Sequence, residues 1–229
     1  MLDRFTWYKQ SAFRWKGDKL VVYIDPWGLI GDLPRADLIL ISHYHFDHFS
    51  PDGEFRDPAK SFAPKGDGDL AKIVGPKTVI VAPRDVAAEL SGNVKAVTPG
   101  DRIEAAGVKI ETVPAYNTVE ERLGAHPKDN RWVGFIYQLG GTTYYHAGDT
   151  DHLPELERVK ADVSFVPVGG TYTMDPTEAA GFVKKQRPKL AVPMHYGYVV
   201  GEPASGERFK KEAAPVEVHL FKPQNTFTL

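Results

Sequence analysis

The sequence of 229 residues contains no cysteine. A disulfide framework, a cysteine-ligated structural zinc site and a cysteine nucleophile are therefore excluded. The sequence also lacks an uncharged apolar run long enough to cross a bilayer, and its first residues carry no apolar signal-peptide core. We expect a cytoplasmic protein without a membrane span, whose chemistry relies on other side chains.

The sequence also has no large excess of positive or negative charge. The formal net charge is −2 and the pI is about 6.4, so no basic field attracts nucleic acid to the molecule. Nucleic acid is not an expected partner, and a small-molecule substrate is. The length suits one substantial core, which predicts a single domain over residues 1–229. No sequence feature indicates an oligomeric state.

Histidine, by contrast, is concentrated in one short stretch directly after the apolar run from Asp37 to Ile41. This stretch contains His43, His45, Asp47 and His48. Imidazole nitrogen and carboxylate oxygen are the usual ligands of zinc in catalytic sites, and they also suit manganese and iron. In extended backbone, residues two apart point the same way, so the first three side chains can share one side while His48 serves a second metal.

Three segments together resemble the metal motifs of the metallo-β-lactamase superfamily. They are His43-x-His45-x-Asp47-His48, then Ala147-Gly148-Asp149-Thr150, then Pro193-Met194-His195-Tyr196-Gly197. More narrowly, the chain resembles small metal-dependent hydrolases related to ascorbate-phosphate lactonase and to N-acyl phosphatidylethanolamine phospholipase D. The resemblance implies a four-layer α/β sandwich, with two mixed β-sheets face to face and helices outside.

The resemblance also implies a site with two divalent metal ions, for which zinc is expected and manganese or iron is compatible. Asp149 would bridge the two ions. His195 would bind the second ion together with Asp47 and His48, while His43 and His45 bind the first.

One position departs from the superfamily pattern. A third histidine for the first metal usually follows a strand such as Val108 to Pro114, but that place here contains Tyr116 and Asn117. Either of these two leaves the metal with fewer protein ligands, or His126 reaches back as a ligand or substrate contact. The sequence leaves these alternatives open.

The order of the remaining segments favours a mixed α/β fold, because strand patterns and helix patterns alternate. Gly140-Gly141 predicts a hairpin turn between two strands that end at Leu139 and His146. Asp175-Pro176 predicts the start of a capped helix. The segment from Asp52 to Gly68 is predicted to be mostly loop with at most a short helix, and residues 216–220 are predicted to form a final strand.

These residues predict a metal-dependent hydrolase. A divalent ion lowers the pKa of a bound water, and the resulting hydroxide attacks a carbonyl or phosphoryl centre. We expect Asp47 and Asp149 to accept or orient the proton, and a small ester, lactone or phosphodiester to be the substrate. Two alternatives are a phosphodiesterase or nuclease acting on nucleotides or nucleic acid, and a non-catalytic metal-binding protein that lacks the third histidine.

Overall fold

The computed structural model describes all residues from 1 to 229. Packing divides them into two compact units, which are described separately. The first unit comprises Met1–Val97, Glu104–Gly107 and Lys222–Thr226, and the second comprises Thr98–Ile103, Val108–Phe221 and Phe227–Leu229. The single domain remains a prediction.

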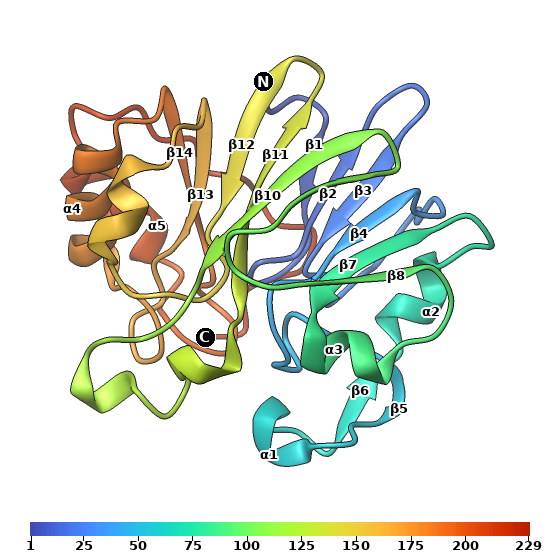
Figure 1. Ribbon diagram of the computed structural model, residues 1–229. Coiled ribbons are helices and arrows are strands. Elements are labelled where there is room, and N and C mark those ends of the chain that lie inside the picture. The colour runs from blue at the N-terminus through green and yellow to red at the C-terminus, as the bar shows by residue number, and fades with distance from the viewer. The chain divides into compact units, whose positions relative to one another are not determined.

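A six-stranded mixed sheet forms the centre of the first unit (Figure 1). Its strands, in spatial order, are β1 (Phe5–Trp7), β2 (Phe13–Lys16), β3 (Val21–Ile24), β4 (Leu38–Leu40), β7 (Val79–Pro83) and β8 (Val94–Val97). The first three strands are antiparallel, whereas β3, β4, β7 and β8 are parallel. The carboxyl ends of β3 and β4 are therefore neighbours at one edge of the sheet.

Apolar runs explain the parallel part of this sheet. Every residue of β4 and β7 is buried, as expected for parallel strands that are covered on both faces. Helix α3 (Arg84–Glu89) packs against β7 and β8. The unit also contains α1 (Pro58–Ser61), α2 (Asp69–Ile73) and a separate ribbon of β5 (Asp52–Glu54) and β6 (Lys65–Asp67).

The second unit contains the other six-stranded mixed sheet, apart from Glu104 and Ala105 of β9, which belong to the first unit. Its strands, in spatial order, are β14 (Leu190–Met194), β13 (Val163–Pro167), β12 (Thr142–His146), β11 (Val133–Leu139), β10 (Val108–Pro114) and β9 (Arg102–Ala105). Strand β11 is antiparallel to both β10 and β12, and β12, β13 and β14 are parallel. Consequently β10, β12, β13 and β14 all run in one direction, and their carboxyl ends meet at one edge.

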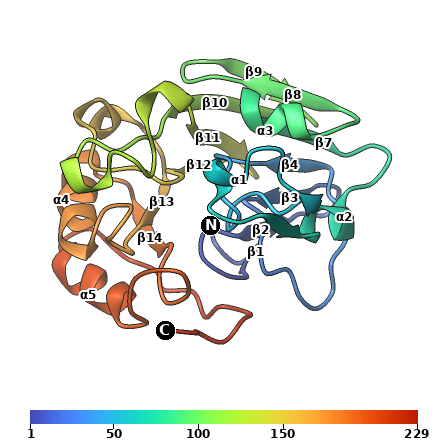
Figure 2. The same cartoon turned by 90° about the horizontal axis from the view of Figure 1, so that it is seen from below.

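Two helices accompany this second sheet. In both views, α4 (Pro176–Gln186) and α5 (Ser205–Glu212) lie side by side, and they pack against β13 and β14 respectively (Figures 1 and 2). Short 3-10 helices occur at Glu120–Arg122, Lys128–Asn130 and Pro154–Arg158.

The predicted start of α4 is confirmed as a capping box. Asp175 accepts hydrogen bonds from the backbone nitrogens of Thr177 and Glu178 at 2.7 and 2.8 Å. The Glu178 carboxylate accepts one from the Asp175 nitrogen at 2.8 Å. Both ends of the box therefore satisfy backbone donors that the first helical turn leaves without helical partners.

The predicted α/β class, with two mixed sheets and helices, is confirmed. Two local predictions are wrong. The segment from Asp52 to Gly68 contains the β5–β6 ribbon in addition to α1, the short helix that the prediction allowed. The two strands of the ribbon are short and polar, so they show no apolar alternation. Residues 216–220 form one isolated bridge, Ala191 to Val218, because they pair with β14 only around Ala191. No helix has the length and apolar character needed to cross a membrane.

We expect Asp175→Ala to lower the free energy of unfolding by about 1 kcal/mol, because the first turn of α4 loses its side-chain acceptor. Chemical denaturation measures the change. Asp18→Ala is the matched control, since Asp18 forms only an exposed ion pair with Arg4 at 3.4 Å and should have almost no effect. Equal effects of the two substitutions would show that the box does not stabilise the helix.

Candidate metal centre

In the first unit, the histidine-rich segment follows β4 and lies beside the turn that follows β3. Asp25, the first residue after β3, is fully buried and has a left-handed φ of 45°. Its carboxylate accepts hydrogen bonds from the Ser42 nitrogen and the Ser42 hydroxyl, both at 2.7 Å. The neighbouring ends of two parallel strands are thus joined by one carboxylate.

This carboxylate also fixes the orientation of His48. Nδ1 of His48 lies 2.8 Å from Oδ2 of Asp25. Because an ionised carboxylate only accepts hydrogen bonds, Nδ1 carries the hydrogen and Nε2 keeps its lone pair. The Nε2 atom lies 3.7 Å from Oδ2 of Asp47. Asp47 in turn accepts a hydrogen bond from the Gln10 amide at 3.2 Å.

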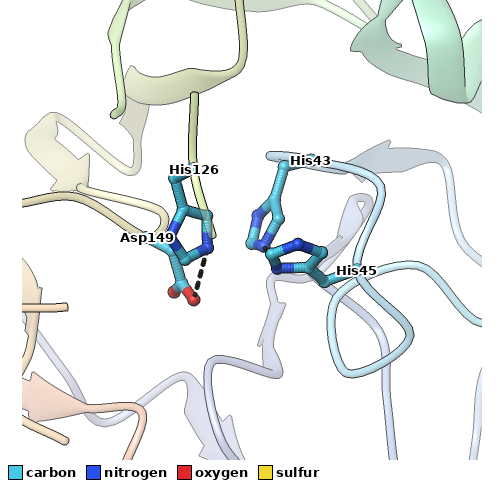
Figure 3. Close-up of side chains that lie close together, drawn as sticks. All are labelled: His43, His45, His126 and Asp149. Atoms are coloured by element: carbon cyan, nitrogen blue, oxygen red, sulfur yellow. Dashed lines mark hydrogen bonds and ion pairs between the residues drawn. The ribbon is translucent and has the colours of Figure 1, made fainter. Parts of the chain in front are cut away.

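The same network extends to His43. The Ser42 hydroxyl donates its hydrogen to Asp25, so it accepts one from Nδ1 of His43, which is 2.8 Å away. Nε2 of His43 therefore keeps its lone pair, and it lies 3.0 Å from Nδ1 of His45 (Figure 3). Two ligand atoms bound at 2.0–2.1 Å to one tetrahedral zinc ion lie roughly 3.3 Å apart. The two imidazoles are thus spaced as ligands of one ion.

In the second unit, the candidate ligands meet around Asp149, which follows β12. Its Oδ2 atom lies 2.9 Å from Nε2 of His195 and 3.3 Å from Nε2 of His126 (Figure 3 shows the latter pair). All three side chains are buried. Both distances again match the spacing of ligand atoms around a metal.

The backbone near His195 is unusual. His195 directly follows β14 and has a left-handed φ of 59°, a conformation that costs energy for a residue with a β-carbon. Gly169 follows β13 and lies so close that a Cβ atom there would overlap the carbonyl oxygen of His195. A glycine at 169 therefore permits the position of His195.

The residues at the place of the usual third histidine have other partners. The Tyr116 hydroxyl donates to Glu155 at 2.8 Å, and burial and this carboxylate raise the pKa of the phenol. The Asn117 carbonyl accepts from Nδ1 of His126 at 2.8 Å. Of the three alternatives, His126 is the one that lies beside Asp149.

The other histidines have partners that suit packing. Nδ1 of the buried His146 accepts a hydrogen bond from the Gly148 nitrogen at 3.3 Å. His152 pairs with Glu157 at 2.8 Å, and His219 is exposed. None of them contributes to the clusters around Asp25 or Asp149.

The sequence alone did not identify Asp25, Ser42 or Gln10 as parts of the site. Asp25 precedes a proline at the end of a predicted strand, which is typical of a turn. Only the pairing of β3 with β4 brings it beside Ser42 and His48. Its burial and its three hydrogen bonds distinguish it from an ordinary turn residue.

The side chains fit divalent metal ions within each unit. All candidate ligands are buried, namely His43, His45, Asp47, His48, His126, Asp149 and His195. They offer imidazole nitrogens and carboxylate oxygens, the donor set of catalytic zinc sites and of related transition-metal sites. Several imidazoles are held by hydrogen bonds at Nδ1, as is usual for metal-binding histidines.

Comparison with known protein families agrees with this chemistry. Residues 4–195 match the family model described as β-lactamase superfamily domain. A UPF0173 metal-dependent hydrolase from Anaeromyxobacter dehalogenans is 33% identical over 93% of this chain and 82% of its own length. A UPF0173 metal-dependent hydrolase from Pyrococcus abyssi is 36% identical over 88% of each chain.

Solved structures show the same fold. A metal-dependent hydrolase from Parabacteroides distasonis superposes with a TM-score of 0.78 at 29% identity, covering 96% of this chain and 93% of that one. The metallo hydrolase Igni18 from Ignicoccus hospitalis shares the fold at 23% identity, with a TM-score of 0.69 and coverage of 96% and 95%. The resemblance in the sequence motifs is thereby confirmed: the chain belongs to the UPF0173 metal-dependent hydrolase family of the β-lactamase superfamily.

Proposed function

We propose that this protein is a hydrolase that uses two divalent metal ions. The observation that carries the proposal is the position of Asp149, of which one carboxylate oxygen lies within 3.3 Å of two imidazole nitrogens from different segments. A carboxylate has two oxygens and a full negative charge, so it is suited to bridge two ions. Family membership and the second cluster, around Asp25, support the same assignment.

The proposal assigns two ligand sets that share Asp149. Following the sequence motifs, His43, His45 and His126 are assigned to the first ion and Asp47, His48 and His195 to the second, with Asp149 shared between them. His126 is assigned as the third histidine, at a different place from the usual one, because it lies beside Asp149 within the same unit.

Bound divalent ions supply a water of lowered pKa and positive charge for a developing oxyanion. The chain's own residues determine where protons go. Asp47 and Asp149 are buried carboxylates beside imidazole nitrogens and are assigned to accept or orient the proton of the attacking water. The amide of Gln10 donates to Oδ2 of Asp47 and holds this carboxylate in place.

Asp25 has a different role in this proposal. It is fully buried and accepts hydrogen bonds from Ser42 and His48, so it orients ligands without binding metal itself. Such outer partners fix the tautomer and direction of a metal-binding imidazole and raise its basicity.

The proposed substrate is a small ester, lactone or phosphodiester. Carbonyl and phosphoryl centres both develop negative charge on oxygen, which the proposed ions would stabilise. Zinc is the proposed metal because its ligand preferences match the donor set. The cytoplasmic location remains a prediction from the sequence.

We expect His195→Ala to lose at least one bound ion per chain and to abolish hydrolysis, because the second ligand set loses an imidazole. Metal content is measured by elemental mass spectrometry. Activity is measured with p-nitrophenyl esters, lactones and a p-nitrophenyl phosphodiester.

The matched control is His219→Ala, since His219 belongs to the same unit and is exposed. It should retain full metal content and turnover. Unchanged metal content in His195→Ala would contradict the ligand assignment. Absence of turnover in metal-loaded wild-type protein with every substrate class would contradict the proposed function.

A second prediction concerns Gly169. We expect Gly169→Ala to weaken metal binding, because the added methyl group overlaps the His195 carbonyl and displaces that residue. Isothermal titration with zinc measures the affinity. Gly181→Ala adds a methyl group where no atom lies within 4 Å, inside α4, and should leave affinity unchanged while stabilising the fold by up to about 1 kcal/mol. Equal zinc affinities in the two variants would rule out this role for Gly169.

A further inference from the structure

The geometry assigns Asn117 as a positioning residue that holds the His126 imidazole in the tautomer that exposes its Nε2 lone pair to metal. Asn117 is buried in the loop after β10. The inference deepens the proposed function and rests on it for the role of His126 as a ligand.

The hydrogen bonds of Asn117 determine which way its amide points. The side-chain nitrogen donates to Oδ1 of Asp151 at 3.1 Å and to the carbonyl oxygen of Tyr172 at 2.9 Å. Both partners are acceptors only, so the amide nitrogen must face them. The reverse orientation would bring the amide oxygen against two other oxygens. The Asn117 carbonyl oxygen therefore points the other way, toward His126.

At His126, the same carbonyl oxygen receives two hydrogen bonds. It accepts one from the backbone nitrogen of His126 at 3.0 Å and one from Nδ1 of the ring at 2.8 Å. An amide oxygen has two lone pairs and no hydrogen, so Nδ1 must be the protonated ring nitrogen. In the neutral ring, Nε2 then carries the lone pair and faces Oδ2 of Asp149 at 3.3 Å (Figure 3).

Asn117 is itself anchored to the segment that carries Asp149. Oδ2 of Asp151 accepts hydrogen bonds from the backbone nitrogens of Thr118 and Val119 at 2.7 and 2.9 Å. Oδ1 of Asp151 forms an ion pair with Arg122 at 2.9 Å. The loop bearing Asn117 is thus tied to a residue only two positions beyond Asp149. This connection holds the His126 ring in position beside the Asp149 carboxylate.

These contacts separate two possible roles for Asn117. A purely structural role would require only its donation to Asp151 and to the Tyr172 carbonyl. A positioning role requires its acceptor oxygen at His126. Substitutions that remove one function and keep the other can distinguish them.

The test compares Asn117→Ala, Asn117→Asp and Arg122→Ala. Aspartate at 117 keeps the acceptor for His126 but places an oxygen against Asp151 and the Tyr172 carbonyl. Arg122→Ala removes the ion pair with Asp151 and leaves Asn117 in place, so it loosens the same loop while retaining the acceptor for His126. If repulsion prevents folding of Asn117→Asp, Arg122→Ala still separates loss of loop anchorage from loss of the acceptor.

Two measurements are made on each variant. Long-range proton–nitrogen NMR of the histidine rings reports which nitrogen of His126 carries the hydrogen, and zinc competition with a chromogenic chelator reports affinity. In wild-type protein we expect hydrogen at Nδ1 and metal at Nε2. Asn117→Ala should lose the protected Nδ1 hydrogen and bind zinc about 10- to 100-fold more weakly.

Asn117→Asp and Arg122→Ala should keep the Nδ1 hydrogen and most of the zinc affinity. An Asn117→Ala protein that keeps the wild-type tautomer and affinity would overturn the inference, as would an Arg122→Ala protein that loses both as fully as Asn117→Ala. The tautomer is also read in metal-free protein at a pH where the ring is neutral. An Nε2-protonated ring there would overturn the inference, whereas an Nδ1-protonated ring without any zinc binding would contradict only the proposed function.

Discussion

Burial of carboxylates beside imidazoles is the physical constraint on which this structure depends. Taking an ionised carboxylate out of water costs several kcal/mol even after the protein relaxes, and other groups must offset that cost. At Asp25, hydrogen bonds from Ser42 and His48 to the carboxylate offset this desolvation cost. Asp149 lies instead against ring nitrogens of His126 and His195, an arrangement that a divalent cation would stabilise.

The topology of each sheet delivers these groups to the ends of parallel strands. Asp25 and Ser42 follow the neighbouring strands β3 and β4, and Asp149 and His195 follow β12 and β14. The rigid strands hold the loops in place, and the loops bear the side chains of the candidate site. The strained conformations at Asp25 and His195 occur at these strand ends, where the candidate site requires defined positions of both side chains.

Local sequence patterns predict much of this fold. The strand after Val108, the hairpin around Gly140 and the capped helix after Asp175 lie where apolar runs, turn residues and capping residues indicate. The ribbon at β5 and β6 was missed because its short polar strands lack apolar alternation. Residues 216–220 alternate apolar and polar side chains, yet they form only one bridge, since alternation does not ensure a long pairing partner.

The candidate site was only partly accessible to sequence reasoning. Dense motifs identify His43 to His48, Asp149 and His195. Asp25 and Asn117 act through contacts between segments far apart in sequence, so the sequence does not show these roles, although it marks position 117 as a departure from the superfamily pattern. His126 lies nine residues beyond Asn117, and only the folded loop shows that its ring faces Asp149.

The most direct test of the account is a crystal structure of the zinc-loaded protein with anomalous diffraction recorded on both sides of the zinc absorption edge. The account predicts two zinc peaks, with Asp149 bound to both and Nε2 of His126 bound to the ion held by His43 and His45. One zinc peak, or a His126 ring without a bond to metal, would contradict it.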